Sequence, residues 1–302
     1  MVDVDVPVVQ SYAAELERAA RRNRFSRFGK ALAAYVVLAV FAVIAVGPFL
    51  YLLAPSFRQS FELFSYPPDW IPNSLYTGNF ATILHETSYV RWGINTAIFT
   101  TSVTLITLVI DTLAGYAFAR LRFPGRTVLF VLVLTTLMIP TAVLIAPLYI
   151  IISNLPGWTH SGINTYPGMI LPMVVSPLGV FMMRQFISTL PEALVEAGRV
   201  DGASEWQIFR KIVLPLMKPP IVVLGIFTFM YQWVNFLWPL VITTTDDMKT
   251  LTVGIASLQG QFVTDWGVIS AAAVMTMAPV IVIFLLFQRW FVQASMAGAL
   301  KQ

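Results

Sequence analysis

The stretch EALVEAGRVDGASEWQIFRKIVLP, residues 192–215, concentrates charge in an otherwise apolar half of the chain. It carries seven charged residues in 24, whereas charged residues make up 11% of the 302-residue chain. Long runs without any charged residue lie on both sides of it, over 127–183 and 219–245. A polar segment between two such runs indicates a connection between two membrane-spanning helices.

The composition of the whole chain is that of a membrane protein. Hydrophobic residues make up 57% of it, and the mean hydropathy is +0.76. A helix needs about 20 apolar residues to cross about 30 Å of hydrocarbon. The run 127–183 is too long for one crossing, and its middle, SNLPGWTHSGINTYPG, is rich in turn formers, so we divide it into two spans. We therefore predict an all-α protein with six transmembrane helices, at residues 31–54, 94–119, 127–151, 167–188, 217–243 and 267–290.

The basic residues predict the orientation of these spans. With a cytoplasmic N-terminus, 16 of the 19 Lys and Arg residues fall on the cytoplasmic side, leaving only Arg58, Arg91 and Lys249 outside. Both termini and residues 190–215 are therefore predicted to face the cytoplasm. The net charge of +4 reflects this topology and not a nucleic-acid partner. The first apolar run is too long for the core of a signal peptide and has no cleavage site, so we read it as a retained helix.

Several segments between the spans allow two interpretations. Residues 1–30 form a cytoplasmic extension, either an amphipathic helix along the inner leaflet or a disordered tail. The external segment 55–93 is predicted to be an interfacial loop and 153–167 a short connection, while 243–265 is either a contact surface or a solvated connector. The two histidines, His85 and His160, fall in these segments and are read as surface residues. The chain has no cysteine, which excludes disulfides and thiolate metal sites.

Local signals within 192–215 predict two short helices with a break between them. Pro191 suits a first helical position, Gly202 supplies a stop, and Ser204 with Gln207 forms a capping box. Small residues (Ala193, Ala197 and Gly198) would allow the backbone of another protein to approach closely. A DNA-reading helix–turn–helix is excluded, because membrane spans begin within a few residues on each side. The segment is predicted to be a docking element fixed to two membrane helices.

This segment resembles the EAA signature of ATP-binding-cassette importer permeases, in which it forms the coupling helix and sits in a cleft of a separate ATPase. Gly198 stands where the family usually has the alanine at the third position of the EAA motif. The resemblance implies that an ATPase contacts this segment through Glu192, Glu196, Ala197, Gly198, Asp201, Gly202, Ala203, Ile212, Leu214 and Pro215.

Further stretches are similar to the carbohydrate-uptake branch of this family, with its MetI-like fold, and above all to the second permease of maltose and glycerol-3-phosphate transporters. These stretches are GYAFARLRFPGR, MIPTAVLIAPLYII, INTYPGMILP and the ending DWGVISAAAV…FLLFQRWFV. The C-terminal tail QASMAGALKQ is similar to the tail of the family, which reaches towards the ATPase interface. The resemblance covers about residues 31–302. It implies a sugar-like solute, a location in the inner membrane of a prokaryote, and three partners: a different permease chain, an ABC ATPase dimer and an extracytoplasmic solute-binding protein.

The chain has no G-x-x-x-x-G-K-[ST] phosphate loop, so ATP hydrolysis is expected in the partner ATPase, with no cofactor bound here. No nucleophile–base pair for an enzyme and no metal-ligand cluster is legible. A proton-coupled secondary transporter would need several intramembrane carboxylates or histidines, and the predicted spans contain only Asp111. A channel subunit would show a charged ring or a carbonyl filter, which the sequence does not.

Two features inside the spans are candidates for the translocation path. Asp111 is either a pore residue or a hydrogen-bonding residue between helices. In QWVNFLWPL, residues 232–240, Val234 and Asn235 replace the family's usual Asn-Glu or Asn-Asp pair. Bare amides in lipid are costly, so this face should look inward, towards a solute or a neighbouring helix. The candidate residues on this face are Tyr231, Gln232, Asn235 and Trp238.

Overall fold

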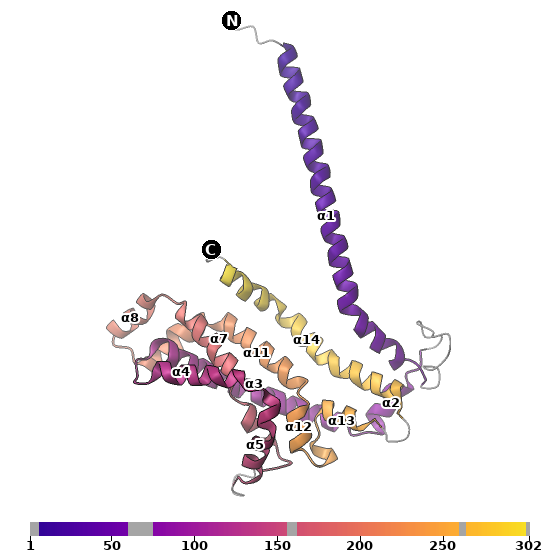
Figure 1. The fold of residues 1–302 in the computed structure, drawn as a ribbon, viewed down its shortest axis with the longest axis vertical. Helices are drawn as coiled ribbons and strands as arrows, with labels where there is room; N and C mark the ends of the chain where they lie inside the picture. The colour runs from indigo at the N-terminus through magenta and orange to yellow at the C-terminus, as the bar shows by residue number, and fades with distance from the viewer. Residues whose placement is uncertain (1–5, 60–74, 156–161, 260–263, 300–302) are drawn as a thin grey trace. The chain divides into compact units, whose positions relative to one another are not determined.

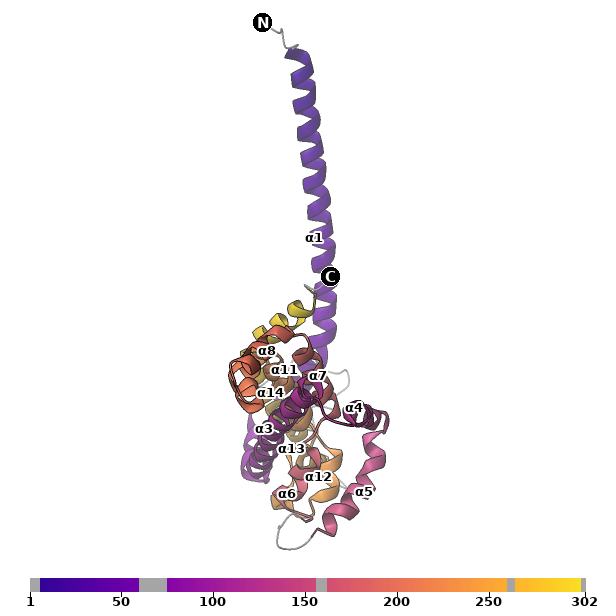
Figure 2. The ribbon, with the colours of Figure 1, turned by 90° about the vertical axis from the view of Figure 1, so that its left-hand side faces the viewer.

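The computed structural model describes residues 6–59, 75–155, 162–259 and 264–299, and within these ranges all regular secondary structure is helical (Figures 1 and 2). Side chains are described for residues 29–59, 75–155, 162–259 and 264–289. Parts of the three predicted external segments, His160 among them, lie outside the described residues. The chain divides into two compact units, residues 1–54 and 55–302.

The first unit consists almost entirely of helix α1 (Val6–Ser56), which continues two residues into the second unit. Its part Gly29–Ser56 is long and apolar enough to cross a membrane. The predicted cytoplasmic extension is therefore helical from Val6 onward, and no break separates it from the first predicted span.

The second unit is built around helix α3 (Tyr89–Arg120), which packs against α7 (Pro177–Ser188) and α11 (Lys218–Trp233). Helix α14 (Trp266–Ala299) packs in turn on α11 (Figure 1). The shorter elements are α2 (Gly78–His85), α4 (Arg126–Thr135), η2 (Thr136–Met138), α5 (Thr141–Ser153), α6 (Tyr166–Ile170), η4 (Leu171–Met173), α12 (Leu237–Ile242), η6 (Asp246–Met248) and α13 (Leu251–Ser257).

Three helices of the described chain can each cross a membrane by length and composition, and three more spans are possible only as bent pairs. The single helices are Gly29–Ser56, Tyr89–Arg120 and Trp266–Arg289. The bent pairs are Arg126–Met138 with Thr141–Ser153 at 107°, Tyr166–Met173 with Pro177–Ser188 at 46°, and Glu205–Leu216 with Lys218–Trp233 at 76° (Figure 2).

Two of the bends follow from proline. Ile139, which precedes Pro140, and Ser176, which precedes Pro177, both have extended backbone angles. Steric clash with the proline ring disfavours the helical region for the residue before it, and at these two positions the helix ends there. The predicted uninterrupted helices over 127–151 and 167–188 are therefore wrong in their continuity.

The predicted helix over 217–243 is also interrupted. Helix α11 ends at Trp233, and α12 begins only at Leu237. The hydroxyl of Thr252 donates a 2.9 Å hydrogen bond to the carbonyl oxygen of Asn235, which lies in this break. A tertiary contact thus satisfies a backbone group that a continuous helix would have satisfied itself.

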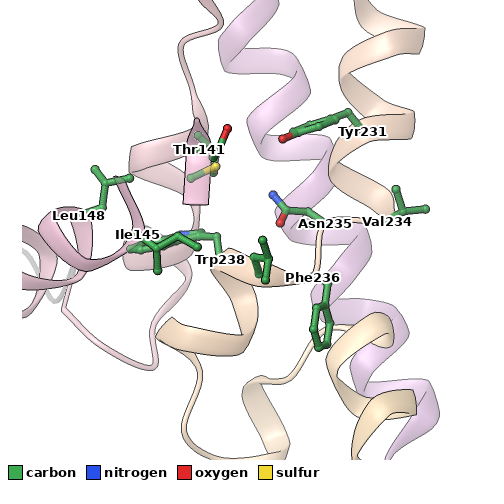
Figure 3. A pocket seen from close by; sticks show the side chains of 10 residues that line it. Thr141, Ile145, Leu148, Tyr231, Val234, Asn235, Phe236 and Trp238 are labelled. Carbon is green, nitrogen blue, oxygen red and sulfur yellow. The ribbon is translucent and has the colours of Figure 1, made fainter. Parts of the chain in front are cut away.

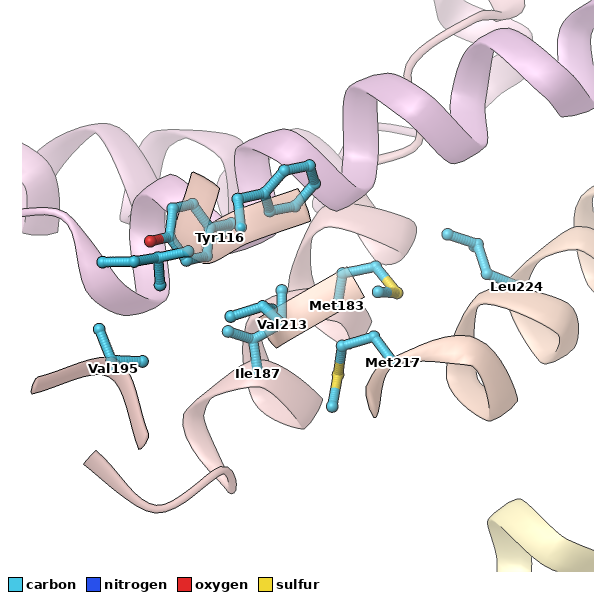
Figure 4. Close-up of a cluster of buried hydrophobic side chains, with 9 residues drawn as sticks. Tyr116, Met183, Ile187, Val195, Val213, Met217 and Leu224 are labelled. Carbon is cyan, nitrogen blue, oxygen red and sulfur yellow. The ribbon is translucent and has the colours of Figure 1, made fainter. Parts of the chain in front are cut away.

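Within the described residues, buried apolar side chains gather in three clusters, one of which includes side chains of residues 190–215 (Figure 4). Packing there is close: a Cβ atom at Gly115 of α3 would lie 2.6 Å from the Cβ of Met183 on α7. Outward-facing apolar side chains, such as Leu105 and Val109 on α3, are exposed, as expected for a surface in contact with hydrocarbon. The buried cluster that includes side chains of residues 190–215 consists of Tyr116, Met183, Ile187, Val195, Ile208, Phe209, Val213, Met217 and Leu224.

Candidate functional site

Residues 190–215, which we call the coupling segment, form two short helices, as predicted. Helix α8 (Glu192–Val200) ends at a turn, and α9 (Glu205–Ile208) continues as the π-helix η5 (Phe209–Val213) and helix α10 (Leu214–Leu216). π-Helical turns are rare and frequently lie at functional sites.

The predicted local signals are confirmed, with one shift of position. Gly202 has a φ of 76°, a conformation that glycine adopts without steric cost. The capping box is complete: Gln207 N donates to Ser204 Oγ (3.3 Å), and Ser204 N donates to Gln207 Oε1 (2.8 Å). Pro191 is the N-cap of α8 and not its first helical residue, because its backbone is still extended.

The signature residues of the coupling segment divide between an exposed surface and an internal contact. The exposed side is formed by Glu192, Glu196, Ala197, Asp201, Gly202 and Pro215, while Ala203, Ile212 and Leu214 are half-buried. Gly198 is buried, and a Cβ there would lie 3.0 Å from Ile212 Cδ1 and 3.1 Å from Ile208 Cγ1. In this structure Gly198 therefore makes room for the segment's own π-helix and leaves Ala193 and Ala197 as the small residues open to a partner.

A polar contact ties the coupling segment to α3. The hydroxyl of Tyr116, which is 4% exposed, donates a 2.7 Å hydrogen bond to Glu205 Oε2. The other oxygen of Glu205 accepts from Arg199 Nε, also at 2.7 Å. One carboxylate thus joins α3, α8 and α9. None of these three residues was among the predicted site residues, although Tyr116 lies in the GYAFAR stretch and Glu205 in the coupling segment.

The C-terminal end of α7, which leads into the coupling segment, is held by Arg120, the last residue of α3. Its Nη2 donates to the carbonyl oxygen of Ile187 at 2.9 Å and to that of Leu190. Ile187 lies in the last turn of α7 and Leu190 two residues beyond its end, where carbonyl oxygens lack the usual helical partner. The chain that leads from α7 into the coupling segment is therefore anchored to α3.

Three of the four residues predicted for the inward face line one pocket of about 230 Å³ (Figure 3). The side chain of Tyr231 is 61% exposed, whereas Trp238 is only 3% exposed. The indole nitrogen of Trp238 donates a 3.0 Å hydrogen bond to the carbonyl oxygen of Met169. The pocket is lined by Thr141, Ile145, Leu148, Met173, Tyr231, Val234, Asn235, Phe236, Leu237 and Trp238.

The two amides meet, but not as predicted. Asn235 lies in the break after α11 and does not share a helical face with Gln232. Its Nδ2 nevertheless donates a 2.9 Å hydrogen bond to Gln232 Oε1. Gln232 is buried and does not line the pocket, so of the two amides only that of Asn235 faces it.

Asp111 does not line this pocket. It is fully buried on α3, and its Oδ1 accepts a hydrogen bond from the backbone N of Ser176 at 3.3 Å. Its surroundings in this structure are those of a residue that bonds neighbouring helices, the second of the two predicted alternatives.

The third predicted external segment is held against the start of α3. Asn95, which is fully buried, donates to the carbonyl oxygens of Asp247 (2.7 Å) and Lys249 (2.8 Å). The hydrogen bond from Ser88, together with Lys249, lowers the pKa of the Asp246 carboxyl. This turn is therefore a fixed and not a loose connection.

Comparison with known proteins agrees with this architecture. The family described as "Binding-protein-dependent transport system inner membrane component" matches residues 111–295. The arabinooligosaccharides transport system permease protein AraQ of Halalkalibacterium halodurans is 38% identical over 266 residues, which cover 87% of this chain and 94% of AraQ. The sn-glycerol-3-phosphate transport system permease protein UgpE of Pectobacterium atrosepticum is 36% identical over 240 residues, 77% of this chain and 84% of UgpE.

Solved structures share the fold. A chain of a bacterial ABC transporter involved in the import of the acidic polysaccharide alginate superposes with a TM-score of 0.76, at 20% identity, over 86% of this chain and 95% of that one. A chain of the inward-facing MetNI methionine ABC transporter gives a TM-score of 0.53, at 22% identity, over 68% of this chain and 94% of that one. This chain therefore belongs to the family of binding-protein-dependent transport system inner membrane components. It is a membrane permease subunit and has the MetI-like fold.

Proposed function

We propose that this chain forms half of the translocation path of an ATP-driven importer for a sugar or sugar-like solute. The names of its relatives support the solute class, since AraQ is named for arabinooligosaccharides and UgpE for sn-glycerol-3-phosphate. The description of the family as binding-protein-dependent supports an extracytoplasmic solute-binding protein as a partner. A second, different permease chain completes the path, and an ABC ATPase dimer binds and hydrolyses the ATP.

In this proposal the chain crosses the inner membrane of a prokaryote six times, with both termini in the cytoplasm. The three single helices and the three bent pairs support this number of crossings if each bent pair is counted as one span. The concentration of 16 of the 19 basic residues on one side supports the orientation. The coupling segment then faces the cytoplasm, where an ATPase can reach it.

The observation that carries the proposal is the attachment of the coupling segment to three membrane helices. It continues from α7 and into α11, and the hydrogen bond between Tyr116 and Glu205 holds it to α3. A partner that displaces α8 must therefore displace these helices as well. Closure of an ATPase dimer on ATP would rock them around the translocation path and so produce alternating access.

The solute path in this proposal follows the pocket beside the break after α11. Its volume of about 230 Å³ lies below the roughly 300–1,000 Å³ of a complete small-molecule site, so it suits one wall of a path shared with a second chain. Exposed Tyr231 offers a ring face for a sugar, and Asn235 offers an amide.

Reconstitution tests the proposal. The chain, co-purified with its partner permease and ATPase, should import labelled arabinotriose or glycerol 3-phosphate into proteoliposomes only when the solute-binding protein is outside and ATP is inside. Collapse of the proton gradient should leave the rate unchanged. Uptake driven by a proton gradient without ATP would contradict the proposal.

A further inference from the structure

The fourth predicted span is broken between η4 and α7, at Val174–Ser176, and α7 leads directly into the coupling segment. A break of this kind leaves a backbone carbonyl and a backbone N–H without helical partners. In the hydrocarbon region such groups must be satisfied from within the protein. The groups that satisfy them therefore influence the angle at which α7 leaves the break.

Two buried side chains of α3, four residues apart, hold the two sides of this break. Thr107 Oγ1 donates a 3.0 Å hydrogen bond to the carbonyl oxygen of Val174, before the break. Asp111 Oδ1 accepts from the backbone N of Ser176, after the break, at 3.3 Å. Residues four apart lie on the same face of a helix, so both contacts come from one side of α3. Both side chains are fully buried.

The carboxyl group of Asp111 also fills the space above Gly179 in the first turn of α7. A Cβ atom at Gly179 would lie 2.1 Å from Asp111 Oδ2, so only glycine leaves room for the carboxyl. Asp111 Oδ2 has no hydrogen-bond partner within the described part of the chain. Towards α7, Asp111 therefore accepts a hydrogen bond and fills the space above Gly179. A neutral side chain of the same shape can do both.

We infer that Thr107 and Asp111 clamp the break in the fourth span and thereby fix the direction of α7, which carries the coupling segment. Asp111 is thus a positioning residue for coupling and not a residue that contacts the solute. The inference rests on the proposed function, because it assigns a role in transmitting ATPase movement to the membrane helices. It predicts that the hydrogen-bond acceptor at position 111 is needed and that its charge is not.

Spin labels can report the direction of α7 without any assumption about the solute. The chain has no cysteine, so Ile98→Cys on α3 and Val200→Cys on α8 would be the only labelled sites in it. Both side chains are exposed. The distance between the two nitroxides is measured in the assembled complex with the partner permease and ATPase. The parent should give one narrow distribution in the absence of ATP.

Loss of the clamp should populate a second distance. In Asp111→Leu and in Thr107→Val, the minor population should rise about five- to tenfold, the change in an equilibrium that one lost buried hydrogen bond brings. Asp111→Asn keeps the acceptor and should match the parent. Thr104→Val is the matched control, because the buried hydroxyl of Thr104 has no partner within the described part of the chain.

Thr107→Val keeps the experiment decisive if Asp111→Leu does not assemble. The inference is overturned if Thr107→Val, and Asp111→Leu where it assembles, give the same distance distribution as the parent. A distribution as broad in Asp111→Asn as in Asp111→Leu would also overturn it, since charge and not the acceptor would then be required. Failure of the proposed function would instead appear as a parent complex without ATP-driven uptake, whatever the label distances.

Discussion

Removal of one hydroxyl group should loosen the coupling segment from α3. In Tyr116→Phe the ring remains in its apolar cluster and keeps its contact with Phe209, whose ring centroid lies 5.2 Å away. Only the 2.7 Å hydrogen bond to Glu205 is lost. A hydrogen bond to a charged group contributes about 1.5–3 kcal/mol, and we expect about the lower value because the Glu205 side chain is 43% exposed.

A loss of about 1.5 kcal/mol corresponds to roughly a tenfold rise in local opening, since 1.4 kcal/mol is a factor of ten in an equilibrium constant. Hydrogen exchange measured by mass spectrometry should therefore speed up about tenfold for peptides that cover α9 and η5 and stay unchanged in α12. Tyr149→Phe is the matched control, because no hydrogen bond of the Tyr149 hydroxyl is found in the described chain. Equal exchange in Tyr116→Phe and in the parent would refute the reasoning, as would the same acceleration in Tyr149→Phe.

Four further predictions follow from the coupling segment, the pocket and the topology. Glu196→Lys, which reverses an exposed charge on α8, should abolish uptake and reduce co-purification of the ATPase at least tenfold, while membrane insertion remains normal; transport at the parent rate would contradict the docking assignment. Gly202→Asp should impair coupling, because a side chain at a φ of 76° is unfavourable by about 1 kcal/mol or more, and ATPase activity that still follows solute addition would argue against this. Asn235→Leu should lower the uptake rate about tenfold with an intact complex, whereas a dissociated complex with normal uptake kinetics would assign the amide to helix packing. Tags after Tyr76 and after Thr245 should be labelled from outside in intact cells and terminal tags should not; an accessible C-terminus would exclude the six-span topology.

The sequence was sufficient to locate apolar, helix-forming segments and to predict the local structure of the coupling segment. Hydropathy depends only on neighbouring residues, and so do the capping box at Ser204 and the left-handed turn at Gly202. The breaks at Pro140 and Ser176 also have a local cause in proline. The rule alone does not locate them, because Pro147 and Pro279 lie inside α5 and α14.

Other features depend on contacts between distant parts of the chain. The break after Trp233 has no glycine or proline at positions 234–236, and Thr252 stabilises it from a later helix. Tyr116 and Glu205 are 89 residues apart, so no local pattern could pair them. The inward orientation of Gly198 likewise depends on the π-helix that packs on it.

The most direct test identifies the protein that contacts α8 in living cells. A single cysteine introduced at exposed Ala197 can carry a benzophenone, since the chain has no cysteine of its own. Irradiation should join this chain to a protein whose peptides contain a G-x-x-x-x-G-K-[ST] phosphate loop, and the same probe at Glu86, on the predicted external side, should not. Capture of the ATPase from Ala197 alone would confirm that the coupling segment docks on a separate ATPase. A probe at Ala197 that captures no such protein, or captures it no better than the probe at Glu86, would contradict this claim.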